Sequence, residues 1–201
     1  MSTEPTVFVV DDDEAVRGAM GFLLKSVGLN SKIYASAEDF LKHYDPSRPG
    51  CLVLDLRMPG TSGLALQETL AARQVQIPII FITAHGDVSS SVRAMKAQAF
   101  DFIEKPFNDQ DLLDRIHDAI SWEGRRRLEG EKIAAIEARI VTLTPREREI
   151  MKKIVDGKPS KLIASELNIS EKTVHTHRAR IMHKMRAESV AALVRMDLSV
   201  G

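Results

Sequence analysis

The hydrophobic positions of the first 120 residues form five short apolar runs, separated by segments in which apolar residues recur at helical spacing. Most of these runs are apolar throughout, which is typical of strands buried on both faces of a parallel sheet. The intervening segments, such as Glu38–Tyr44, Val88–Ala97 and Asp109–Ile120, predict helices. The pattern therefore predicts an α/β domain over residues 1–120, built on a doubly wound, five-stranded parallel sheet. The predicted strands are Thr6–Val10, Ser31–Tyr34, Cys51–Leu54, Ile77–Thr83 and Ala99–Glu104.

The pattern changes after Ile120. Residues 121–142 carry no strand signal, but Ile133, Ile136 and Ile140 are helically spaced. We predict a helical linker that extends the preceding helix. Because this apolar stripe is short, we expect the isoleucines to pack on a neighbouring element rather than to form a coiled coil.

Residues 143–201 predict a small all-α domain of four helices. The first begins at Thr144-Pro145 with a capping-box Glu147, and Gly157 ends it. The later helices are predicted over about Ser160–Leu167, from the cap Ser170, and over about Ser189–Leu198. Short helices on either side of the tight turn Asn168-Ile169 are typical of a helix-turn-helix.

The zero net charge hides an uneven distribution. Residues 1–120 hold 11 basic and 17 acidic side chains, and residues 121–201 hold 17 and 11. The basic part is a candidate for binding a polyanion such as DNA, although a chance split of surface charge fits the same numbers.

Composition adds expectations about the compartment. The single cysteine, Cys51, cannot form an intramolecular disulfide and opens an apolar run, so we expect a buried thiol. The sequence shows no secretory signal and no apolar run as long as a membrane helix, so we expect a cytoplasmic protein without a membrane partner.

Polar residues end or follow four of the predicted strands. Asp11-Asp12-Asp13, Asp55, Thr83 and Lys105 should meet at one edge, because the carboxyl ends of parallel strands lie together. Crowded carboxylates there predict a site for Mg²⁺ (or Mn²⁺), which lets one carboxylate act as a nucleophile toward a phosphoryl group. Asp13 is better suited to cap the following helix.

Residues 6–120 resemble the receiver domains of bacterial two-component systems, which have a flavodoxin-like fold. The segments that carry the resemblance are Val9–Asp13, Leu54–Gly60, Ile82–His85 and Lys105–Phe107. It implies that Asp55 accepts phosphate from a sensor histidine kinase and that Lys105 holds that phosphate, with a cis bond to Pro106. The implied metal ligands are Asp11, Asp12, Asp55 and the main-chain carbonyl of Arg57, and the implied switch residues are Thr83 and Phe102.

Residues 143–198 resemble the helix-turn-helix of the LuxR/FixJ family (NarL-type) of transcription regulators. The resemblance rests on Leu143–Glu147, Gly157, Lys161–Ala164, Leu167–Ser170 and Thr173–His177, followed by Ile181 and Lys184. Helical periodicity separately predicts that Val174, Ile181 and Met185 of the third helix face inward. The resemblance implies base contacts from His175, Thr176 and Ala179, and phosphate contacts from Lys172, Thr173, Arg178 and Arg180.

Together these features predict a transcriptional response regulator that binds double-stranded promoter DNA and dimerises when Asp55 is phosphorylated. It would be no enzyme beyond self-phosphotransfer and autodephosphorylation at Asp55. A phosphatase with an aspartyl-phosphate intermediate is a rival, but such enzymes usually have a second Asp where this chain has Arg57. A second rival is a DNA-binding protein with a structural receiver, whose activity does not depend on phosphorylation. Such proteins commonly lose the acidic pocket or the lysine, and this chain keeps both.

Overall fold

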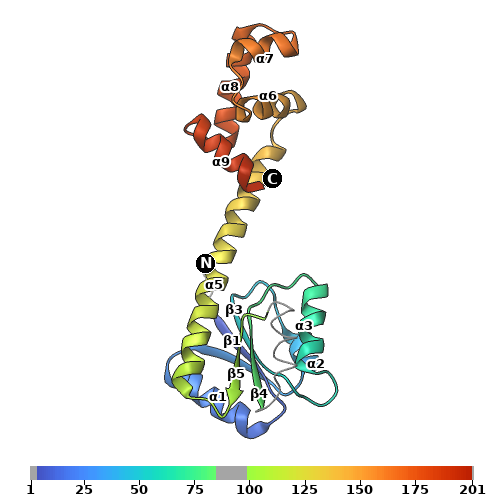
Figure 1. Ribbon diagram of the computed structural model, residues 1–201, viewed down its shortest axis with the longest axis vertical. Helices are drawn as coiled ribbons and strands as arrows, with labels where there is room; N and C mark the ends of the chain where they lie inside the picture. The colour runs from blue at the N-terminus through green and yellow to red at the C-terminus, as the bar shows by residue number, and fades with distance from the viewer. Residues whose placement is uncertain (1–3, 85–98, 201) are drawn as a thin grey trace. The chain divides into compact units, whose positions relative to one another are not determined.

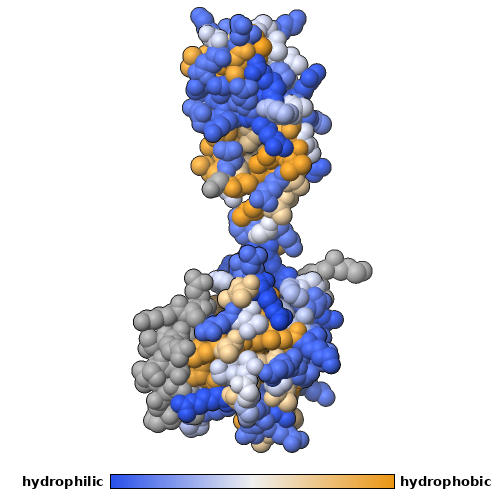
Figure 2. Space-filling model, turned by 90° about the vertical axis from the view of Figure 1, so that its right-hand side faces the viewer, coloured by the Kyte–Doolittle hydropathy of each residue, from blue (hydrophilic) through white to orange (hydrophobic). Residues whose placement is uncertain are grey.

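The computed structural model describes residues 4–84 and 99–200. The chain divides into two compact units, Met1–Arg126 and Arg127–Gly201 (Figure 1). On the face in Figure 2, both units expose mostly hydrophilic side chains, with smaller apolar patches among them. No helix in the described ranges is both long enough and apolar enough to cross a membrane.

A five-stranded parallel sheet forms the centre of the first unit, with the strand order β2-β1-β3-β4-β5. This arrangement confirms the predicted doubly wound sheet. Every residue of the central strands β1 and β3 is buried, which explains why their sequences lack apolar–polar alternation. The strands are β1 Thr6–Val10, β2 Asn30–Tyr34, β3 Gly50–Asp55, β4 Ile79–Ala84 and β5 Asp101–Lys105.

Helices cover both faces of this sheet (Figure 1). On one face, strand residues such as Phe8 and Phe81 form a core that includes Phe40 of α2 and Leu66 of α3. On the other face, Val53 packs with residues of α1 and α5. The helices are α1 Glu14–Ser26, α2 Ala37–His43, α3 Gly63–Ala72 and α5 Asp109–Val141. The predicted helix at Val88–Ala97 lies outside the described residues.

Side-chain caps fix where the first and fifth helices begin. Asp13 Oδ1 accepts hydrogen bonds from the N–H groups of Ala15 (2.8 Å) and Val16 (3.4 Å), so the predicted cap of α1 is confirmed. Asn108 Oδ1 accepts a bond of 2.8 Å from the N–H of Gln110. Both caps satisfy N–H groups that have no partner within the helix.

α5 is one helix of 33 residues, as predicted from the missing strand signal after Ile120. Its first part buries Leu112, Ile116 and Ala119 against the sheet. Farther along, Ile136 and Ile140 pack on the core of the C-terminal unit, as expected for an apolar stripe that meets a neighbour, whereas Ile133 is not part of this core. The proposed linker boundaries at residues 121 and 142 stay a prediction.

Four helices and one apolar core make up the rest of the C-terminal unit, which confirms the predicted all-α architecture. The helices are α6 Pro145–Val155, α7 Ser160–Leu167, α8 Glu171–Met185 and α9 Val190–Val200. Asn168 adopts a left-handed conformation, with φ 53°, and closes the tight turn between α7 and α8. Ser170 then caps α8 by accepting a bond of 3.1 Å from the N–H of Thr173.

Glu147 takes part in both a helix cap and a partly buried ion pair. Its carboxylate accepts a hydrogen bond of 2.9 Å from the N–H of Thr144, which completes the predicted capping box. The same oxygen lies 2.7 Å from Lys184 Nζ on α8. The Lys184 ammonium, together with the Thr144 N–H, lowers the pKa of Glu147 to about 2.

Glu147→Gln should therefore destabilise the C-terminal unit by about 1–2 kcal/mol, because an amide loses the charge-assisted bond from Lys184. The ionised pair stabilises the fold fully above the unfolded-state pKa of 4.5 and is lost as the pH falls toward about 2. Urea unfolding followed by circular dichroism at several pH values measures both effects. Glu149→Gln, at an exposed surface ion pair, is the control and should change little. Equal loss in the two variants would contradict the role given to Glu147.

Candidate functional site

The polar residues predicted to meet do lie together at the carboxyl edge of the sheet. Val10 pairs with Leu54 in the register of β1 and β3, which places Asp11 beside Asp55. Asp11, Asp55 and Thr83 are among the few buried polar side chains of the described residues, at 1%, 8% and 4% exposure. Lys105 ends β5, and its bond to Pro106 is cis, as the receiver resemblance implies.

Lys105 joins the two carboxylates. Its Nζ lies 3.0 Å from Asp11 Oδ2 and 2.9 Å from Asp55 Oδ1. One ammonium therefore pairs with two carboxylates in a half-buried site, where such interactions are less screened than on the surface.

Main-chain groups hold the other carboxylate oxygens. Asp55 Oδ2 accepts a hydrogen bond of 2.7 Å from the N–H of Arg57, and Asp11 Oδ1 accepts one of 2.9 Å from the N–H of Asp13. These bonds fix the orientation of both carboxylates relative to the loops that follow β1 and β3.

Burial has the largest effect on the pKa of Asp55. It raises the pKa of the Asp55 carboxyl above its ordinary value, and the neighbouring Asp11 charge adds to the rise, while Lys105 opposes it. Burial alone would lower the pKa of Lys105, but its bonds to the two carboxylates raise it instead. The lysine therefore stays charged, and the carboxyl that faces it is less acidic than an exposed aspartate.

The donor set suits a hard cation. Carboxylate and carbonyl oxygens are the ligands that Mg²⁺ takes, usually one or two carboxylates with waters and phosphate oxygens. Asp11 and Asp55 lie together, and the exposed Asp12 and the carbonyl of Arg57 belong to the adjoining loops. Within residues 4–84 and 99–200, no group of three or more His, Cys, Asp or Glu side chains is arranged to hold a metal, so the four ligands remain a prediction.

The two predicted switch residues differ in exposure. Thr83 is buried near the end of β4, and Phe102 on β5 is 39% exposed. Phe81 and Phe102 are register partners on β4 and β5. Their proposed roles depend on a change between two states, so they stay predictions.

Two residues near the site have roles that sequence reasoning missed. Arg17 of α1 donates from Nη1 to the main-chain carbonyls of Asp11 (2.9 Å) and Asp12 (2.7 Å), and so holds the acidic loop against the helix. Gly63 begins α3, and a Cβ there would lie 2.4 Å from the carbonyl oxygen of Asp55. Each looks ordinary in sequence, because only the fold brings it to the loop.

Gly63→Ala should destabilise the N-terminal unit by about 1–3 kcal/mol, because the added methyl overlaps the Asp55 main chain. Urea unfolding followed by the fluorescence of the single tryptophan, Trp122, measures this loss. Gly18→Ala is the matched control: its Cβ meets nothing within 4 Å in α1, so stability should stay equal or rise. If the two variants had the same free energy of unfolding, the close approach at Gly63 would not contribute to stability.

α8 carries the second group of predicted residues. Val174, Ile181 and Met185 are fully buried, which confirms the predicted inward face. The predicted contact residues lie on the rest of the helix: Lys172, His175, Thr176, Ala179 and Arg180 are exposed, and Thr173 and Arg178 are half-buried. The exposed surface thus offers positive charge and short polar groups, which fit the phosphates and base edges of a major groove.

Cys51 takes no part in these sites. It is buried at the start of β3, and burial raises the pKa of its thiol to about 12. A thiol of this kind is not a nucleophile near neutral pH.

Comparisons with known proteins agree with the fold. Residues 7–117 match the family model of the response regulator receiver domain, and residues 141–197 match that of the bacterial regulatory proteins of the luxR family. The chain is 44% identical to nodulation protein W of Bradyrhizobium diazoefficiens over 200 residues, covering 100% of this chain and 88% of the relative. It is 45% identical to the transcriptional regulatory protein FixJ of Rhizobium meliloti over 199 residues, covering 99% and 98%.

Among solved structures, the response regulator StyR is similar, with a TM-score of 0.88, 46% identity and coverage of 98% of this chain and 99% of that one. A doubly wound sheet with an acidic edge, followed by a helix-turn-helix, defines the class of two-component response regulators. The chain belongs to the response regulators that join a receiver to a LuxR-type DNA-binding domain, and it is a transcriptional regulator.

Proposed function

We propose that Asp55 is the phosphoacceptor and that a sensor histidine kinase supplies the phosphoryl group. The observation that carries the proposal is the Lys105 ammonium shared between Asp11 and Asp55 at the carboxyl edge of the sheet. A carboxylate oxygen of Asp55 attacks phosphorus, an O–P bond forms, and the N–P bond to the kinase histidine breaks. Lys105 Nζ then pairs with the phosphoryl oxygens. Water then hydrolyses the acyl phosphate at the same residue, which releases inorganic phosphate and returns the carboxylate.

Receiver domains generally bind Mg²⁺ at their acidic site. In this chain the proposed ligands are Asp11, Asp12 and Asp55 with the main-chain carbonyl of Arg57, and Mn²⁺ suits the same oxygens. A bound cation neutralises charge on the incoming phosphoryl group. Arg17 contributes indirectly, because its bonds to the carbonyls of Asp11 and Asp12 keep the acidic loop in place.

Phosphorylation is proposed to control DNA binding through Thr83 and Phe102. The Thr83 hydroxyl would donate to the phosphoryl group, and Phe102, now 39% exposed, would turn inward. The changed face of the receiver, residues 1–120, would then pair two copies. Their DNA-binding domains, residues 143–201 after the linker 121–142, would read a two-fold related site in promoter DNA.

Within the DNA-binding domain, α8 is proposed as the recognition helix. His175, Thr176 and Ala179 would contact base edges. The proposed phosphate contacts come from Lys172, Thr173, Arg178 and Arg180. The support is the position of these residues on α8, opposite or beside its buried face.

Incubation of the chain with Mg²⁺ and a small-molecule phosphodonor tests the acceptor. The expected product carries one phosphoryl group at Asp55, found by mass spectrometry and released by hydroxylamine, as an acyl phosphate should be. Labelling of a serine or histidine, or none with the metal present, would contradict the proposal.

A further inference from the structure

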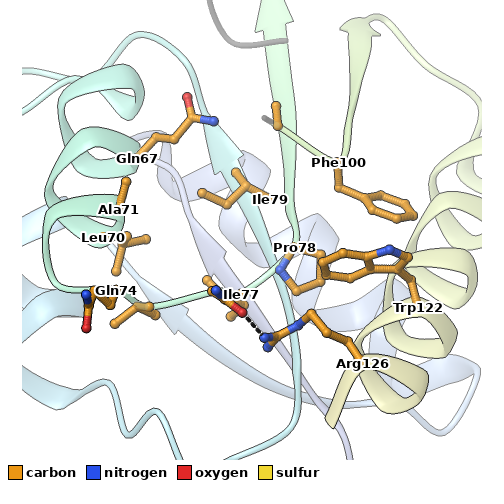
Figure 3. A pocket seen from close by; sticks show the side chains of 13 residues that line it. Gln67, Leu70, Ala71, Gln74, Ile77, Pro78, Ile79, Phe100, Trp122 and Arg126 are labelled. Atoms are coloured by element: carbon orange, nitrogen blue, oxygen red, sulfur yellow. Dashed lines mark hydrogen bonds between the residues drawn. The ribbon is translucent and has the colours of Figure 1, made fainter. Parts of the chain in front are cut away.

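Three side chains pack in a row, called the stack below, where β5 begins and α5 nears the end of the N-terminal unit; the two rings are tilted by 56°. The ring of Phe100, next to β5, lies 5.9 Å from the ring of Trp122 on α5. The guanidinium of Arg126 lies 5.5 Å from the Trp122 ring centre, within reach of a cation–π interaction. Figure 3 shows the three side chains in this order around one end of a groove.

Arg126 also ties this turn of α5 to the rest of the unit. Its Nη1 donates a hydrogen bond to the side-chain carbonyl of Gln76, in the loop between α3 and β4. Its Nη2 lies 3.8 Å from Oε1 of Glu123, whose side chain is only 3% exposed. Arg126 is the last residue of the N-terminal compact unit, so these contacts hold α5 at its final turn there.

β5 connects this turn to the acidic site. Lys105 ends the strand and binds Asp11 and Asp55, about 16 Å along the strand from Phe100. Near the other end, Asp101 forms an ion pair with Arg115 of α5, and the Phe100 N–H donates to the Ile79 carbonyl at 2.9 Å. A short strand fixed to a helix at one end and to the carboxylates at the other can pass a shift of Lys105 to α5.

The groove beside the rings gives them room to repack. It has a volume of about 1060 Å³ and is lined by Gln67, Leu70 and Ile79 as well as by Phe100 and Trp122 (Figure 3). Trp122 is 40% exposed, so its indole can leave Phe100 without opening the core. The stack thus has room for a second arrangement, which coupling between distant groups requires.

We propose that β5 transmits the state of Asp55 to the linker through the stack of Phe100, Trp122 and Arg126. This inference rests on the proposed phosphorylation of Asp55. When Lys105 turns from the two carboxylates to the phosphoryl group, β5 shifts and the Phe100–Trp122 contact changes. The change reaches Arg126 and alters its contacts with Gln76 and Glu123. These contacts hold the last turn of α5 in the N-terminal unit, and the helix continues from there to Val141.

Trp122 is the only tryptophan in the chain, so its fluorescence reports directly on this stack. The full-length chain is treated with Mg²⁺ and a small-molecule phosphodonor, and the extent of phosphorylation is measured by mass in the same sample. We expect the emission of Trp122 and its quenching by acrylamide to change in step with phosphorylation. Complete phosphorylation with unchanged emission and quenching would overturn the inference but leave the proposed function intact. No phosphorylation at Asp55 would instead remove the proposed function.

Phe100→Leu removes the ring from the stack and keeps an apolar side chain. The variant should be phosphorylated as the wild type is, but lose the fluorescence response and about 2- to 30-fold of the phosphorylation-dependent gain in DNA affinity. Phe22→Leu, the same exchange at a ring 79% exposed on α1, should behave as the wild type. A full response in Phe100→Leu, or an equal loss in both variants, would contradict the relay. The wild-type fluorescence decides the question alone if Phe100→Leu does not fold.

Discussion

Asp55→Asn is expected to abolish phosphorylation and, with it, the gain in DNA affinity that a phosphodonor produces. The asparagine amide is not a nucleophile toward phosphorus, but its oxygen can still accept the Arg57 N–H. The variant should therefore keep the fold and its unphosphorylated DNA binding. Coupling between two sites is typically about 1–3 kcal/mol, so the wild type should gain about 5- to 150-fold in affinity and the variant nothing.

The measurement pairs DNA-binding titrations with mass by light scattering, each with and without phosphodonor. Asp118→Asn is the matched control, because it removes one negative charge from an exposed position on α5. It should respond as the wild type does. If Asp55→Asn also gained affinity and mass, then neither the acceptor nor the switch would be at Asp55.

His175→Ala and Arg180→Ala should weaken DNA binding in different ways. A base contact is worth about 1–3 kcal/mol of discrimination, so His175→Ala should lose affinity for a preferred site and lose sequence preference at one position. Arg180→Ala should weaken binding to every sequence, and the slope of log K against log salt should fall by about 0.9. Both residues are exposed on α8, so neither change should unfold the domain.

Titrations against a duplex selected from a random library and against a scrambled duplex, at several salt concentrations, separate the two effects. Lys152→Ala, an exposed lysine of α6 without a proposed DNA contact, is the control for loss of charge alone. If Arg180→Ala lost no more DNA affinity than Lys152→Ala, Arg180 would not contact the DNA. If His175→Ala lost the same affinity for every DNA sequence, His175 would contact a phosphate rather than a base.

The sequence allowed the fold to be predicted well because local patterns and topology agree. Unbroken apolar runs mark buried parallel strands, and the carboxyl ends of such strands share an edge, which brings Asp11 to Asp55. Element ends were less predictable. β4 was expected from Ile77 but begins at Ile79, because Pro78 has no N–H to donate.

The contacts that complete the site could not be predicted in the same way. The bonds from Arg17 to two loop carbonyls and the close approach of Gly63 to Asp55 depend on how α1 and α3 pack, and no local periodicity encodes that. The contact between Phe100 and Trp122 could not be predicted either, because it depends on how β5 packs against α5. In the sequence alone, a Phe next to a strand predicts only a core residue.

The lysine shared between two aspartates also affects which anions the site admits. Without a bound cation, two carboxylates and one ammonium leave a net negative charge, and two of the three Lys105 donors are already used. Free sulfate or inorganic phosphate would be repelled there and would find few donors. In this cation-free state the site is thus poorly suited to hold a loose oxyanion as a ligand.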